Sequence, residues 1–196
     1  MTQELIFALI GFAFATSITP GPNNMMLLAS GVNFGFRRTL PHMLGISLGH
    51  AFMVFLVGIG LAKLLAQWHL VILALKVAAV LYMLWLAWKI ANAAPPREGE
   101  DRGKPLSFVQ AAAFQWVNPK AAAMALSAVT VYGGDGSPAS ITLVALTFCA
   151  VNLPSVAVWA LAGQNLRLWL TSNARLRIFN RTMAVLLVLS LWPVLA

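Results

Sequence analysis

The feature that most constrains the fold of this chain is the run Thr-Pro-Gly-Pro-Asn-Asn, residues 19–24, inside its first long apolar stretch. A second run, Trp-Val-Asn-Pro-Lys at 116–120, interrupts a later apolar stretch about half the chain further on. Proline lacks a backbone donor and its ring clashes with the preceding turn, so we expect each run to open a helix. Within a bilayer, open backbone is tolerated only where protein or a water-filled cavity surrounds it. Paired breaks in the two halves of a chain are typical of a transporter's binding site.

The composition places the chain in a membrane. It is 60% hydrophobic and 9% charged, with a mean hydropathy of +0.82. We therefore predict an all-α membrane protein of six transmembrane helices, with proline-broken helices one and four. The apolar runs predict spans at 4–30, 40–62, 69–91, 107–131, 139–162 and 177–196.

The polar stretch 93–105 divides the six spans into two groups of three. We expect a single transporter domain over 1–196, made of repeat one at 1–92, a cytoplasmic linker at 93–105 and repeat two at 106–196. Because each repeat has an odd number of spans, the second would insert upside down relative to the first, as inverted repeats do.

Positive charge gathers in the loops at one predicted end of the spans. Ten of the thirteen Lys and Arg residues lie there, and the positive-inside rule makes that end cytoplasmic and both termini periplasmic. Membrane orientation explains the net charge of +8 better than nucleic-acid binding, which we do not expect. The ten are Arg37, Arg38, Lys89, Arg97, Arg102, Lys104, Arg167, Arg175, Arg177 and Arg181.

The first break offers both signs of partial charge to a ligand. A helix that ends near Thr19 leaves carbonyls unpaired, and a helix that begins near Pro22 leaves amides free. These groups match the ammonium and the carboxylate of a zwitterionic amino acid. The predicted substrate-binding residues are Thr19, Pro20, Gly21, Pro22, Asn23, Asn24, Asn118, Pro119 and Lys120. A plain proline kink packed between neighbouring helices is the alternative.

Two ionisable residues are predicted deep in the membrane. Lys120 could hold a substrate carboxylate or couple transport to protons, or it could snorkel to the surface. His50 could relay protons, or be a core histidine bonded to a backbone carbonyl. Gly45 and Gly49 have small-xxx-small spacing, which suits a helix contact within the chain or in a homodimer. Asn152 and Pro154 are expected to break span five, and all four residues are candidates for lining the cavity.

Some chemistry is missing from the sequence. The acidic residues (Glu4, Glu98, Glu100, Asp101 and Asp135) all lie at ends or in loops, which argues for small neutral amino acids over cationic ones. We expect no metal, no cofactor and no enzymatic activity, because metal-ligand clusters, a phosphate loop and a nucleophile–base pair are not recognisable. The single cysteine, Cys149, excludes a vicinal thiol pair for electron transfer.

These residues together resemble the LysE/RhtB family of amino-acid exporters. The resemblance rests on the two proline runs, on Gly35-Phe36-Arg37-Arg38, on Gly45 and Gly49, and on residues 82–89. Runs at 22–24, 87–91 and 159–163 are most similar to the cysteine/O-acetylserine exporter branch. The resemblance implies proton-driven export of small amino acids (cysteine- or O-acetylserine-like, or threonine-, homoserine- or leucine-like) across the bacterial inner membrane. A passive small-solute channel is the alternative.

Overall fold

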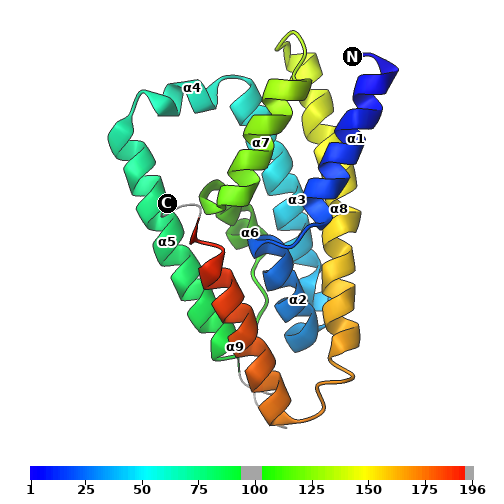
Figure 1. Ribbon diagram of the computed structural model, residues 1–196, viewed down its shortest axis with the longest axis vertical. Helices are drawn as coiled ribbons and strands as arrows, with labels where there is room; N and C mark the ends of the chain where they lie inside the picture. The colour runs from blue at the N-terminus through cyan, green and yellow to red at the C-terminus, as the bar shows by residue number, and fades with distance from the viewer. Residues whose placement is uncertain (94–102, 193–196) are drawn as a thin grey trace.

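The computed structural model describes residues 1–93 and 103–192, and every regular element in these ranges is a helix (Figure 1). Most of the predicted linker at 93–105 and the last residues of the sixth predicted span lie outside them. The elements are α1 (Gln3–Ile18), α2 (Pro22–Phe34), α3 (Phe36–Gly58), α4 (Leu61–Ala66), α5 (His69–Ala91), α6 (Phe108–Phe114), η1 (Gln115–Val117), α7 (Pro119–Tyr132), α8 (Pro138–Leu166) and α9 (Asn173–Leu189).

The break predicted in the first apolar stretch is confirmed. α1 ends at Ile18, α2 begins at Pro22, and the two helices bend by 56° at the junction. Pro22 occupies the first helical position, where its missing N–H costs nothing. Gly21 precedes it in an extended conformation and supplies no side chain to cap the first amides of α2.

The second predicted break is also confirmed. α6 gives way to the short 3-10 helix η1, and Asn118 leaves the helical conformation before Pro119 starts α7. The Asn118 side-chain oxygen accepts a hydrogen bond from the Lys120 amide at 3.2 Å, so this residue caps α7. At its other end α6 is set by a capping box between Ser107 and Gln110.

The two broken pairs run in opposite directions. In Figure 1, α1 and α2 lead the chain down the long axis, whereas α6 and α7 lead it back up. The long helix α8 packs against α1, α2 and α3, and α5 packs against α9. α8 therefore supports both sides of the first break.

Close helix contacts depend on glycines. A Cβ added at Gly49 of α3 would lie 2.6 Å from the Cα of Ala112 in α6, and one at Gly45 would meet the same helix at Phe108 and Ala111. A Cβ at Gly163 of α8 would lie 3.1 Å from Gly31 Cα in α2. Small residues let these backbones touch, as in other membrane helix pairs. The Gly45–Gly49 spacing thus serves a contact within one chain.

Three helices in the described ranges are long and apolar enough to cross a membrane, namely α3, α5 and α8, and the bent pair α1–α2 adds a fourth if it is counted as one span. The predicted span at 107–131 is divided by its break, and α9 covers 17 residues. The all-helical membrane architecture is therefore established for these segments, while the six-span inverted repeat stays a prediction.

One predicted break is wrong. α8 continues through Pro154 as a single 29-residue helix. A proline inside a membrane helix is tolerated when nearby groups bond the backbone that it frees. Pro154 leaves the Ala150 carbonyl without its usual donor. The Ser155 hydroxyl donates to the next carbonyl, that of Val151, at 2.7 Å. The side chain after the proline thus contributes to bonding this turn, and α8 continues.

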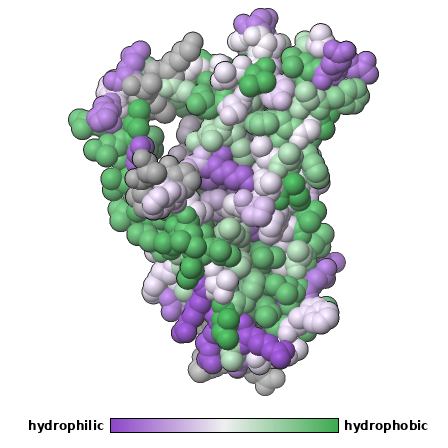
Figure 2. All heavy atoms as spheres, in the orientation of Figure 1, coloured by the Kyte–Doolittle hydropathy of each residue, from purple (hydrophilic) through white to green (hydrophobic). Residues whose placement is uncertain are grey.

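Polar residues mark the two ends of the molecule. Figure 2 shows hydrophilic atoms at both ends of the long axis and a mostly hydrophobic band between them, interrupted by a hydrophilic patch near its middle. The end where α3 and α9 begin and α5 and α8 finish carries the described arginines. The opposite end holds the α7–α8 loop, where hydrogen bonds from Ser137 and Ser140 lower the pKa of the Asp135 carboxyl to about 2.

Candidate functional site

The two breaks meet through Lys120, the second residue of α7. Its ammonium group donates to the Thr19 carbonyl at 2.7 Å, to the Thr19 hydroxyl at 3.0 Å and to the Pro20 carbonyl at 3.3 Å. The carboxyl end of a helix carries partial negative charge, so a cation is favourable there. Lys120 is half-buried and bonds to open backbone, with no carboxylate partner in the described residues.

The carbonyls at the end of α1 also accept hydrogen bonds from side chains of α2 and α8. The Asn24 amide donates to the Ser17 and Thr19 carbonyls at 2.8 and 2.7 Å. The Trp159 indole of α8 donates to the Ile18 carbonyl at 3.0 Å. Because backbone exposed to hydrocarbon is costly, these bonds explain how the helix can stop inside the apolar band.

A pair of amide side chains joins α2 to η1. Asn23 donates to the Gln115 side-chain oxygen at 2.9 Å, and Gln115 donates back to Asn23 at 3.2 Å. Gln115 is fully buried and also donates to the Ala111 carbonyl at 2.9 Å. This reciprocal pair closes the site on its α6 side.

These groups surround a small polar cavity of about 20 Å³. That volume holds about one water molecule and is too small for an amino acid, so a substrate must move the surrounding groups apart. The lining residues are Thr16, Ser17, Gly21, Asn23, Asn24, His50, Asn118, Lys120, Ala121, Met124 and Asn152.

His50 and Asn152 line the same cavity as Lys120. Asn152 of α8 donates to the Ser17 hydroxyl at 3.0 Å and accepts from the Ser47 hydroxyl at 2.9 Å, which ties α1, α3 and α8 together. His50 is 2% exposed, and neither of its ring nitrogens has a hydrogen-bond partner in the described chain. Its ring packs edge-on against Phe148 at 5.2 Å. A buried polar group without a partner is a natural contact for water or for a ligand.

The structure brings together most of the predicted site residues. Gly21, Asn23, Asn24, Asn118 and Lys120 line the cavity, as do His50 and Asn152. Thr19 and Pro20 lie beside it and offer their oxygens to Lys120, and Pro22 and Pro119 each start a helix. Gly45 and Gly49 pack against α6, and Pro154 does not line the cavity.

Sequence reasoning missed five polar side chains of this site, namely Thr16, Ser17, Ser47, Gln115 and Trp159. Gln115 carried a usable signal, because a glutamine within an apolar stretch and next to a proline break needs a buried partner. Ser17 and Ser47 fit any apolar helix as small residues, and Trp159 resembles an interfacial tryptophan, so nothing local marks their roles. Among the described residues, no group of His, Cys, Asp and Glu side chains could hold a metal ion.

A polar cavity at two helix breaks, inside an apolar helical bundle, defines a membrane translocator. The chain matches the family model described as LysE type translocator over residues 14–190, and it belongs to that family. The resemblance that the sequence showed is thereby confirmed, and the protein is a multi-pass protein of the bacterial inner membrane.

Its curated relatives include proteins named cysteine/O-acetylserine efflux protein. Three of them come from Escherichia coli (strain K12), Escherichia coli O139:H28 (strain E24377A / ETEC) and Shigella sonnei (strain Ss046). Each is 32% identical over 169 residues, which covers 83% of this chain and 84% of the relative. No solved structure matches the chain.

Proposed function

We propose that this protein exports a small neutral amino acid of the cysteine or O-acetylserine type across the inner membrane. The observation that carries the proposal is the Lys120 ammonium, held on the carbonyl end of α1 at the break between α1 and α2. The names of the relatives support the class of substrate. Neither described acidic residue, Glu4 or Asp135, lines the cavity, which disfavours a cationic substrate.

Binding proceeds by an exchange of partners. The substrate carboxylate pairs with the Lys120 ammonium. The substrate ammonium then donates to the Thr19 and Pro20 carbonyls, which Lys120 no longer occupies. The free amides at the start of α2 add to the carboxylate's partners, since a helix N-terminus favours an anion. The substrate ammonium thus replaces the Lys120 ammonium at the carbonyls, and the substrate carboxylate pairs with Lys120, so the exchange leaves no unpaired charge in the apolar band.

Transport then follows alternating access between two inverted repeats. The opposite directions of α1–α2 and α6–α7 support this arrangement, because an inverted repeat reverses every element of its partner (Figure 1). The arginine-rich end faces the cytoplasm and the N-terminal end faces the periplasm, as the positive-inside rule directs. The proton gradient supplies the driving force, with Lys120 and His50 as the candidate groups for coupling. The cavity is complete within one chain, so the mechanism needs no homodimer.

The test is counterflow in proteoliposomes against a panel of amino acids, with and without a pH gradient. We expect a saturable signal for cysteine or O-acetylserine that grows with the gradient. The Lys120→Ala protein should insert normally, and its transport rate should fall about ten- to hundredfold. That factor corresponds to the free energy of one charge-assisted hydrogen bond. Lys76→Ala is the matched control, because Lys76 is an exposed lysine of α5 outside the cavity.

Two results would contradict the proposal. Flux that does not saturate and ignores the gradient would indicate a passive channel. Unchanged transport by Lys120→Ala would remove Lys120 from the binding site.

A further inference from the structure

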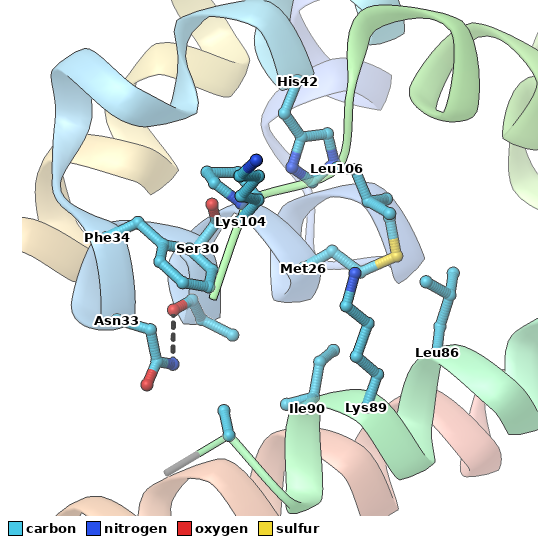
Figure 3. Close-up of a pocket in the computed structure, with 13 residues that line it drawn as sticks. Met26, Ser30, Asn33, Phe34, His42, Leu86, Lys89, Ile90, Lys104 and Leu106 are labelled. Carbon is cyan, nitrogen blue, oxygen red and sulfur yellow. Dashed lines mark hydrogen bonds between the residues drawn. The ribbon is translucent and has the colours of Figure 1, made fainter. Parts of the chain in front are cut away.

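A second cavity lies nearer the arginine-rich end of the molecule. It measures about 60 Å³ and is enclosed by α2, α3, the end of α5 and the segment at 104–106 (Figure 3). Its walls are mostly apolar, with Met26, Leu86 and Leu106 among them. It is roughly three times as large as the central cavity and shares no lining residue with it. It too is smaller than an amino acid, so its walls must also move apart to admit one.

Two lysines reach this cavity from different walls. Lys89 comes from α5 and Lys104 from the segment that precedes α6, and Figure 3 shows the Lys89 side chain extending from its helix into the space. Lys89 also lies 5.4 Å from the centre of the Trp85 ring, which helps to hold it in place. Neither lysine has a carboxylate partner among the residues that the structure describes. The cavity therefore offers two cations to an anion.

His42 gives an independent sign that the cavity is a binding site. It lines the cavity, is 1% exposed, and has no hydrogen-bond partner on either ring nitrogen within the described residues. Buried polar side chains in native proteins are almost always bonded. A ligand with a donor or an acceptor would complete the site.

One face of α2 connects this cavity to the central one. Asn23 lines the central cavity, and Met26, Ser30 and Asn33 line the second one. Steps of three or four residues place all four on the same side of the helix. The Asn23–Gln115 amide pair adjoins the central cavity through Asn23, and the cluster of Met26 with Phe114 adjoins the second cavity through Met26. The two cavities are successive chambers along α2, closed from each other in this structure.

We infer that the second cavity is an inner vestibule that binds the substrate amino acid before it reaches Lys120. The inference rests on the proposed function. Lys89 and Lys104 pair with the substrate carboxylate, and His42 hydrogen-bonds to another polar group of the substrate. The apolar walls contact the substrate side chain. Opening the Asn23–Gln115 pair then passes the substrate to the central cavity.

The first experiment measures binding of radiolabelled O-acetyl-L-serine to purified protein. Lys120→Ala disables the central site, so the saturable binding that it retains reports on the vestibule. Adding Lys89→Gln and Lys104→Gln to that variant should weaken the remaining binding at least tenfold, the loss of about one charge-assisted hydrogen bond. Adding Arg175→Gln instead is the matched control, because it removes an exposed charge at the same end of the molecule outside the cavity.

Three outcomes would overturn the inference. The first is no saturable binding by Lys120→Ala when the wild-type chain binds, and the second is equal binding after the two lysines are removed. The third is an equal loss with Arg175→Gln, which would assign the effect to surface charge. Absence of both binding and counterflow in the wild-type chain would instead refute the proposed function itself.

A second experiment separates the substrate from an anionic lipid headgroup, which carries the same charge. Counterflow of O-acetyl-L-serine is measured with the Lys89→Gln and Lys104→Gln double variant, in phosphatidylcholine vesicles with and without phosphatidylglycerol. We expect the KM at the arginine-rich face to rise about tenfold in both kinds of vesicle. The maximal rate should stay within about twofold of that of the wild-type protein. A rise confined to vesicles with phosphatidylglycerol would assign the cavity to lipid and overturn the inference.

Discussion

The contact between α3 and α6 makes a quantitative prediction, because α6 leads directly into the second break. A Cβ at Gly49 would lie 2.6 Å from Ala112 Cα, whereas ordinary contacts of this kind begin at 3.4 Å. The added methyl group must therefore push the two helices apart by about 0.8 Å, because backbone cannot swing aside as a flexible side chain can. We predict that Gly49→Ala destabilises the protein and displaces Gln115 from Asn23.

The magnitude follows from two opposing effects. Overpacking of this kind costs about 1–3 kcal/mol, while replacing glycine by alanine within a helix contributes about 0.8–1.0 kcal/mol in its favour. Gly11→Ala isolates the second effect, since a Cβ there meets nothing within 4 Å. The difference in unfolding free energy between the two variants should therefore equal the packing cost. For a chain of this size, that cost corresponds to a Tm difference of about 2–12 °C.

The assay is thermal unfolding of both variants in the same detergent, followed by counterflow in proteoliposomes. Gly49→Ala should unfold at the lower temperature and transport more slowly, because a displacement of about 1 Å can cost as much as a hundredfold in a site that needs accurate positioning. Equal Tm values for Gly49→Ala and Gly11→Ala would refute the reasoning. So would wild-type transport by a Gly49→Ala protein of lowered stability.

Three further predictions concern the breaks and the loop between α7 and α8. Gly21→Ala should slow transport with little change in Tm, because its Cβ would lie 2.7 Å from the flexible Lys120 side chain and push it off the α1 carbonyls; wild-type rates would count against this. Pro20→Ala combined with Pro22→Ala should impair transport by restoring donors and letting α1 continue towards α2, which a vesicle flux assay checks against each single variant. The Asp135 pKa is lowered from 3.8 to about 2 by its hydrogen bonds within the loop. Those bonds therefore stabilise the folded loop fully above about pH 4, and this stabilisation is lost as the pH falls to about 2. Proteolysis of this loop should rise over that range, and less so in Asp135→Asn.

The elements that could be predicted were those with a local cause. Each proline run breaks its helix because the missing donor and the ring clash act within one turn, whatever surrounds them. Lys120 was recognisable because a cation in an apolar stretch needs a partner. Pro154 was misread for the opposite reason: its local signal matched that of the other prolines, and α8 nevertheless continues through it with support from Ser155.

The partners of the site could not be predicted. Gln115 pairs with Asn23 across 92 positions, and Lys120 reaches Thr19 across 101. Nothing near these residues in the chain specifies such a pairing, because it results from the way in which whole helices pack. The same holds for Gly49, whose small size could have served a contact in one chain or between two.

By itself, the sequence determined that this protein is a bundle of apolar helices broken at two proline runs. Hydropathy acts over the length of one span and proline geometry over one helical turn, so both can be read locally. Only the tertiary structure decided that the two breaks face each other around one cavity. It also decided that Lys120 satisfies the end of α1 and that α2 carries a second chamber. Those features depend on contacts between segments far apart in the chain, where close approach at a few glycines sets which polar groups meet.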